Sequence, residues 1–341
     1  MECKEQVQNL LKEVLKKFQV EQIVKQIDEY EKINEEAENP VIKVCPKCGQ
    51  VHPVLIKSGC TRNGKQLLRC KTCNKRFVSD SGQLTFYSHQ DESAWISFID
   101  DQLCGVDLNT SAYRLGVHIS TAFRMRHKLL HALEMLTNKE SVEDVVEMDE
   151  KYIAICHKGT LIKGVKPRKH GSNVGKAGLS NRQVCIMTAV SRNGNAFIHA
   201  FNMGKPKETD GNMLCQHVSE NSFCFTDGIK VYDKGLKKRH CDLKHLKLED
   251  YTKVDHLNNV NHLHSIIEKK IIGYRNIASK YINRYNALFM IQYKFRTLTP
   301  RERLLKVLAL LRQQQDYFFI REIHTTDLFG PLESIFAAMA I

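Results

Sequence analysis

Two CxxC pairs, Cys45 with Cys48 and Cys70 with Cys73, are the clearest chemical signal in this sequence of 341 residues. Twenty-one residues separate the pairs, and this segment predicts a short β-hairpin. Four thiolates brought together by two such turns form the tetrahedral sulfur set that zinc prefers. We therefore predict a structural zinc ribbon over residues 41–80, with these four cysteines as the Zn²⁺ ligands.

Two aspartates are the second candidate for chemistry. Asp149 lies inside the apolar strand pattern "EMDEKY", and Asp227 ends the strand pattern "FTDG". An isolated buried carboxylate is costly, so each must be paired, hydrogen-bonded or bound to a metal. A basic segment lies between them, because residues 157–182 hold seven Lys or Arg and no acid. Carboxylates beside a basic surface suit Mg²⁺ or Mn²⁺ chemistry on phosphodiesters, in which ions activate the attacking oxygen and stabilise the leaving one.

Charge and composition narrow the classes of partner. The 51 Lys and Arg exceed the 38 Asp and Glu by 13, which favours an anionic partner such as nucleic acid. Four of the twelve cysteines lie in CxxC pairs, and the sequence shows no N-terminal apolar signal segment, so we expect a reducing compartment. No apolar run is long enough to span a membrane. The sequence also lacks the HExxH and GxSxG motifs, and its "GSNVGKAG" departs from a phosphate-binding loop.

The sequence predicts helical segments before and after the ribbon. Residues 1–40 form an amphipathic helical segment and linker, and residues 90–138 predict a helix-turn-helix broken at Gly116. Ser120 or Thr121 is placed to cap the second helix. We expect the exposed side of this helix to bind DNA, and the basic residues there are Arg124, Arg126, His127 and Lys128. A helical bundle with a basic face is the alternative.

Residues 142–300 predict a mixed α/β layer. The strand patterns are "VVEMDEKYIAI", "QVCIMTAV", "AFIHAFN" and "SFCFT", with a hairpin at the turn "SRNGN". Helical patterns follow in "NNVNHLHSIIEKKIIGY", which Asn258 and Asn259 are placed to cap, and in "KYINRYNALFMIQYKF". Residues 301–341 predict a C-terminal helical tail.

The order of these features resembles the ISXO-type insertion-sequence transposases of the DDE superfamily. The resemblance runs from about Cys45 to Phe289 and rests on the ribbon, the helix-turn-helix, "VVEMDEKYI", "FTDGIKVY" and "LNNVNHLHSIIEKK". It implies an RNase-H-like catalytic domain, that is, an α/β mixed sheet with flanking helices, preceded by the zinc ribbon and the helix-turn-helix.

The resemblance also implies three metal-binding positions. Asp149 and Asp227 are the first two, and Asn261, 34 residues after Asp227, is the third. An Asn at this place ligates a hard cation through its carbonyl oxygen but brings no charge. Seven residues further on the family usually has a Lys, whereas this sequence has Glu268, followed by Lys269. Glu268 could restore a third carboxylate, could be a solvated neighbour of a working Lys269, or could mark a decayed copy; we favour the second interpretation.

The leading prediction is a DNA transposase that binds the terminal inverted repeats of its element and performs metal-dependent strand cleavage and strand transfer. Lys166, Arg168 and Lys169 would contact DNA phosphates. The expected partners are double-stranded DNA and further copies of the chain, and the expected location is the cytoplasm of a prokaryote, at the nucleoid. Two alternatives remain: a DNA-binding regulator with a domesticated, inactive catalytic domain, and an RNase-H-like nuclease without strand transfer.

Overall fold

The computed structural model describes residues 42–159, 183–315, 318 and 320–323. The predicted N-terminal helical segment, the DNA-binding candidates Lys166, Arg168 and Lys169, and most of the C-terminal tail lie outside the described residues. The described chain divides into two compact units. One holds the residues up to 100 and those of 299–317, and the other holds residues 101–298 with those after 317.

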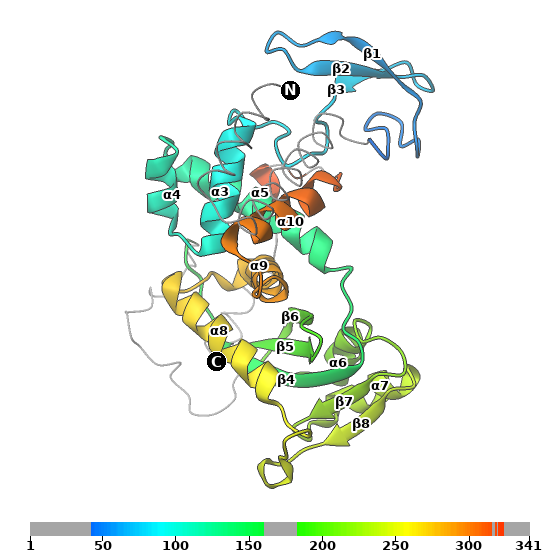
Figure 1. Cartoon of the computed structure of the whole chain (residues 1–341), viewed down its shortest axis with the longest axis vertical. Coiled ribbons are helices and arrows are strands. Elements are labelled where there is room, and N and C mark those ends of the chain that lie inside the picture. The colour runs from blue at the N-terminus through cyan, green and yellow to red at the C-terminus, as the bar shows by residue number, and fades with distance from the viewer. Residues whose placement is uncertain (1–41, 160–182, 316–317, 319, 324–341) are drawn as a thin grey trace, which may run out of the picture. The chain divides into compact units, whose positions relative to one another are not determined.

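The first unit contains a three-stranded antiparallel sheet (Figure 1). Its strands are β1 (Leu55–Cys60), β2 (Gln66–Cys70) and β3 (Arg76–Val78). The predicted hairpin between the CxxC pairs is therefore confirmed, and β3 extends it by one strand. A small buried cluster of Ile42, Cys45, Cys70 and Phe77 lies beneath the sheet, so two of the predicted zinc ligands belong to the interior of this subdomain.

Two helices complete the first unit. Helix α3 (Glu92–Cys104) buries Trp95 and Phe98, and its residues after Asp100 belong to the second unit. Helix α10 (Pro300–Arg312) begins with a capping box, in which the Thr299 hydroxyl accepts from the backbone N–H of Glu302. The Glu302 carboxylate accepts in return from the backbone N–H of Thr299.

The second unit is built on a five-stranded mixed sheet in the order β6-β5-β4-β7-β8. The strands are β4 (Val145–Ala154), β5 (Gln183–Ser191), β6 (Ala196–Met203), β7 (Phe223–Thr226) and β8 (Asp242–His245). β4, β5 and β6 form an antiparallel meander, whereas β7 and β8 run parallel to β4. This is the RNase-H-like arrangement, and the predicted fold class is confirmed.

The sequences of the strands follow their places in the sheet. β5 reads "QVCIMTAVS" and is buried from its second residue to its end, as expected for a strand covered on both faces. β8, at the edge, is short and mostly exposed, which limits pairing with other chains. The turn between β5 and β6 contains Gly194 at φ 106°, a conformation that favours glycine.

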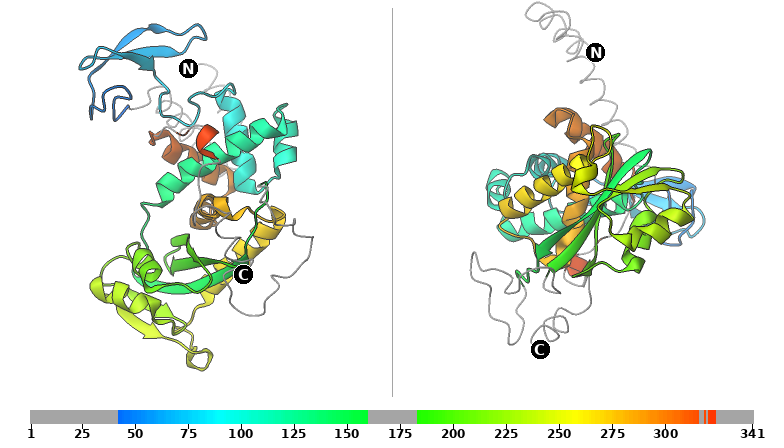
Figure 2. Two further views of the ribbon diagram at one scale, coloured as in Figure 1. Left: turned by 180° about the vertical axis from the view of Figure 1, so that it is seen from behind. Right: turned by 90° about the horizontal axis from the view of Figure 1, so that it is seen from below.

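Six α-helices of the described residues belong wholly to the second unit. They are α4 (Leu108–Arg114), α5 (Ile119–Thr137), α6 (Glu208–Cys215), α7 (Asp233–Lys238), α8 (Asn258–Gly273) and α9 (Ile282–Lys294). Helices α8 and α9 cover one face of the sheet, and α6 and α7 cover the other (Figure 2). Helix α9 is buried around almost its whole circumference because α5 packs on its far side. Among the described residues, no helix combines the length and apolar character needed to cross a membrane.

Two glycines let α6 and α7 pack closely. A Cβ at Gly211 of α6 would lie 2.0 Å from the backbone oxygen of Val231. A Cβ at Gly235 of α7 would lie 2.7 Å from Sγ of Cys215. Both distances are far below van der Waals contact, so the backbones at these two positions have no room for a larger residue.

Candidate functional site

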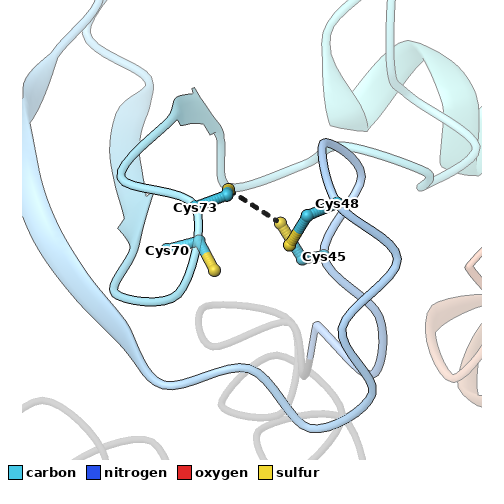
Figure 3. A group of neighbouring side chains, drawn as sticks. All are labelled: Cys45, Cys48, Cys70 and Cys73. Carbon is cyan, nitrogen blue, oxygen red and sulfur yellow. Dashed lines mark hydrogen bonds between the residues drawn. The ribbon is translucent and has the colours of Figure 1, made fainter.

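The four predicted zinc ligands lie together in the first unit (Figure 3). Their Sγ atoms are all within 4.8 Å of one another, and those of Cys45 and Cys73 are 3.9 Å apart. Tetrahedral zinc with bonds of ~2.3 Å to sulfur requires sulfur–sulfur distances of about 3.8 Å. The cluster therefore fits a zinc ribbon.

The two CxxC turns have the same backbone design. Gly49, at φ 74°, donates its N–H to the carbonyl of Cys45 at 2.9 Å, and Asn74, at φ 56°, donates to the carbonyl of Cys70 at 2.9 Å. Glycine and asparagine are the residues that adopt this left-handed conformation most readily. The backbone N–H of Cys73 lowers the pKa of the Cys70 thiol to about 6, against the opposing effect of burial, which favours the thiolate form that binds metal.

Three carboxylates meet in the second unit where the end of β7 lies beside the middle of β4. Asp149 lies in β4, and Asp227 directly follows β7. Because β4 and β7 are parallel and Met148 is opposite Thr226, the next residues of both strands lie side by side. The carboxylate oxygens of Asp149, Glu150 and Asp227 come within 4.8 Å of one another. Asp149 and Asp227 were predicted to meet, whereas Glu150 was missed.

The acidic group has the electrostatics of a cation site. Burial, and then the charge of Asp227, raises the pKa of Asp149 to about 6. Burial also raises the pKa of Glu150 to about 7, although the buried Tyr232 hydroxyl donates a hydrogen bond to Oε1 of Glu150. Each of these carboxylates disfavours ionisation of the others, and all of them offer hard oxygen ligands. Such a group fits a divalent cation such as Mg²⁺ or Mn²⁺.

Helix α8 brings a histidine to the same carboxylates. Nδ1 of His264 lies 3.5 Å from Oδ2 of Asp149, and its Nε2 lies 3.1 Å from the hydroxyl of Thr188 in β5. Burial lowers the pKa of His264 to about 4, so the imidazole is neutral at pH 7 and this contact is not an ion pair. His264 therefore packs the helix against the sheet without neutralising Asp149.

Asn261 lies one turn before His264 on α8 and is exposed. Its side chain forms a hydrogen bond with the phenol of Tyr251. Burial and then the charges of Asp149, Glu147 and Asp227 raise the pKa of Tyr251, so this phenol lies within the field of the acidic group. Tyr251 occurs in a polar stretch, and nothing in the sequence distinguished it.

Glu268 has a partner that the sequence did not indicate. Its carboxylate lies 2.7 Å from Nζ of Lys151, two residues beyond Asp149 on β4. The hydrogen bond and charge of Lys151 lower the pKa of Glu268. Among the described residues, the acidic group around Asp149 does not include Glu268, which instead pairs with a lysine at the surface, and Lys269 is exposed.

The second helix of the predicted helix-turn-helix differs from expectation. Arg124 is exposed and Lys128 is half-buried, but Arg126 and His127 are buried, so the prediction that these last two are exposed is wrong. Nε of Arg126 donates to Gln102 at 2.6 Å, and its guanidinium lies over the ring of Tyr274. Arg126 therefore stabilises the helical packing and is not available to DNA.

The helix starts also differ from the predictions. Helix α5 is capped by His118, whose Nδ1 accepts from the backbone of Ser120, and not by Ser120 or Thr121. Helix α8 begins at Asn258 with no capping side chain of its own. Glu147 of β4 accepts the N–H groups there instead, a contact between residues 112 positions apart that no local pattern could indicate.

Comparisons with known proteins agree with the geometry of the second unit. The model of the ISXO2-like transposase domain family matches residues 141–295. No curated protein matches the sequence. Two similar solved structures are the pre-cleavage Mos1 transpososome (10% identity, TM-score 0.26, covering 67% of this chain and 80% of that chain) and the Mos1 strand transfer complex (11% identity, TM-score 0.28, covering 67% and 79%). The RNase-H-like fold is assigned from the strand order β6-β5-β4-β7-β8.

Proposed function

We propose that this chain is a transposase of the ISXO2-like kind, because the model of that domain family matches residues 141–295, and that it cuts one DNA strand at each end of its element and joins the freed end to target DNA. In the first step water displaces the 3′ oxygen of the terminal nucleotide from phosphorus. In the second step the resulting 3′ hydroxyl attacks a phosphodiester of the target and displaces a 3′ oxygen there.

The acidic group of Asp149 and Glu150 on β4 with Asp227 after β7 is the observation that carries this proposal. Asp149, Asp227 and Asn261 would hold Mg²⁺ or Mn²⁺, and Glu150 is a further candidate ligand. When bound, the ions supply stabilisation of the attacking and leaving oxygens. The side chains of the protein would fix the place of the cations, and the ion pair of Lys151 with Glu268 lies beside them.

DNA recognition is assigned to the zinc ribbon and to the helix-turn-helix formed by α4 and α5. Exposed Arg124 and half-buried Lys128 remain candidates for DNA contact, whereas Arg126 is withdrawn. Lys166, Arg168 and Lys169 remain candidates for phosphate contacts by their charge. Cutting at two element ends favours a homo-oligomer that holds both ends.

The test is to incubate the purified chain with a duplex carrying the element's terminal repeat, a plasmid target and Mg²⁺. We expect nicked and joined DNA from the wild type and a loss of more than about 100-fold for Asp149→Ala, because a direct ligand matters at least as much as the outer partners of a metal site. Asp242→Ala, an exposed carboxylate on β8, is the matched control and should retain activity.

Each alternative predicts a different product. Equal cutting by wild type and Asp149→Ala would contradict the assignment of the site. Specific DNA binding without nicking or joining under either metal would favour the regulator. Nicked DNA without joined product would favour the nuclease.

A further inference from the structure

Glu147 is a charged side chain at the centre of the second unit, and its side chain has no exposed surface. Its Oε1 accepts from Nε of Arg192 at 3.0 Å and from Nδ2 of Asn259 at 2.8 Å. Its Oε2 accepts from the backbone N–H of Asn259 at 2.8 Å and of Val260 at 3.2 Å. A buried carboxylate is tolerated only with such partners, so this one is firmly held.

The partners of Glu147 join the two elements that carry the proposed metal ligands. The N-cap residue of α8, Leu257, has no capping side chain, and an anion at this end of the helix is favoured by the helix dipole. Asn261 follows Val260 directly. Asp149 is the next residue of β4 on the face that Glu147 occupies, since side chains alternate along a strand. One carboxylate thus ties the strand of Asp149 to the helical turn of Asn261.

We propose that Glu147 is a positioning residue of the metal site: by binding the first turn of α8 it holds Asn261 beside Asp149 and Asp227. This inference rests on the proposed function, because it assumes that these three residues share a cation. Outer partners that orient metal ligands typically change metal affinity by about 10- to 100-fold. A carboxylate that only stabilised the fold would leave the metal affinity of the folded protein unchanged.

The experiment uses the full chain and two glutamate-to-glutamine variants. Glu147→Gln keeps the shape of the side chain but removes its charge and one acceptor oxygen. Glu134→Gln is the matched control, because Glu134 is a largely buried acid of the same unit, 3.9 Å from Nε of Arg284. The Kd for Mn²⁺ is measured without DNA from the electron paramagnetic resonance of the free ion. Hydrogen exchange of the Asn259 and Val260 amides reports the first turn of α8.

We expect the Kd for Mn²⁺ to rise about 10- to 100-fold in Glu147→Gln and less than about twofold in Glu134→Gln. The Asn259 and Val260 amides should exchange faster only in the first variant. An unchanged Kd in folded Glu147→Gln, or a wild type that binds no Mn²⁺, overturns the proposal.

A milder variant keeps the test decisive if Glu147→Gln does not fold. Asn259→Ala removes one side-chain donor to Glu147 and should still weaken Mn²⁺ binding about threefold or more, whereas an unchanged Kd overturns the proposal. Because the Mn²⁺ measurement needs no DNA, it is separate from the proposed function. A wild type that binds Mn²⁺ but does not cut DNA contradicts the transposase chemistry and leaves the positioning result standing.

Discussion

Glu150 and Tyr232 form a buried pair on the face of the sheet opposite α8. Tyr232 is fully buried, and its hydroxyl donates to the carboxylate of Glu150. Burial raises the pKa of Glu150 to about 7, and this hydrogen bond lowers it. The negative charge that Glu150 contributes to the acidic group therefore depends on the hydroxyl of Tyr232.

Removing that phenol gives a pH-dependent prediction. Tyr232→Phe removes the hydrogen bond that favours the carboxylate, so the pKa of Glu150 rises further and less of it is ionised at pH 7. We expect the pH midpoint of Mn²⁺ binding to move upward by about one unit or less. Titrations of Mn²⁺ between pH 6 and 9 measure this midpoint, with exposed Tyr113→Phe as the control. A midpoint that stays in place, or falls, would show that Glu150 does not contribute to binding.

Among individual site residues, the sequence predicted those whose own segments show an unusual pattern. Asp149, Asp227 and the four cysteines carry their signals in their own segments, because an Asp in an apolar strand and a CxxC turn are each unusual. Glu150 was missed because strand alternation assigns it to the face opposite Asp149, although the carboxylate oxygens of both lie within 4.8 Å of each other. Arg126 was misjudged because periodicity does not reveal that Gln102 and Tyr274 cover it.

The zinc ribbon is an element whose stability is predicted to depend on its metal. Its buried cluster is small, so four bonds to a bound Zn²⁺ would provide much of its folding free energy. We expect about one Zn²⁺ per chain in the wild type and loss of zinc and of protease resistance in the ribbon after Cys70→Ser. Metal analysis and limited proteolysis measure both. Cys60→Ser, an exposed cysteine at the end of β1, is the control, and equal zinc loss in both variants would contradict the ligand set.

The close approach of Gly211 in α6 to the backbone of Val231 predicts that a larger residue there lowers stability. Gly211→Ala places a Cβ 2.0 Å from the carbonyl oxygen of Val231, so the backbones must separate, and we expect a loss of about 1–3 kcal/mol in the free energy of unfolding. Gly273→Ala at the end of α8 is the matched control, because a Cβ there meets nothing within 4 Å. Urea unfolding compares the two variants, and equal stabilities would show that α6 shifts without cost.

The elements that the sequence predicted best are those with strong local patterns. The β5–β6 hairpin has an Asn-Gly turn between apolar strands, and the α8 and α9 segments have long helical periodicity. Three short elements were missed: α6, α7 and β8. They contain glycines or alternating charges, and they take their conformation from packing against the sheet and not from their own propensity.

For the molecule as a whole, buried histidines predict how stability depends on pH. Burial lowers the pKa of His199 to about 4, and its Nε2 accepts a hydrogen bond from Nδ2 of Asn283 at 2.8 Å, which requires the neutral ring. The unfolded chain binds a proton below about pH 6.5 whereas the folded chain does not. The stability that the neutral His199 ring contributes is therefore present above pH 6.5 and is lost as the pH falls toward 4. The free energy of unfolding falls by up to about 1.4 kcal/mol per pH unit over this range.

Urea unfolding at pH 7.5 and pH 5 measures this dependence. His199→Gln should reduce the loss of stability at pH 5, since the new side chain does not titrate. His262→Gln, an exposed histidine of α8, should leave the pH dependence as in the wild type. A steeper loss in His199→Gln than in the wild type would contradict the assignment of a neutral buried ring.

The separation of 112 positions between Glu147 and Asn259 has a consequence for the stage of synthesis at which we expect the protein to become active. Contacts between distant residues form late, because the long loop between them must close first. During synthesis the meander of β4, β5 and β6 is complete long before α8 has been made. We expect a chain interrupted before Asn258 to contain Asp149, Glu150 and Asp227 and yet to be unable to cut DNA. We therefore expect the proposed activity only after α8 has docked on β4.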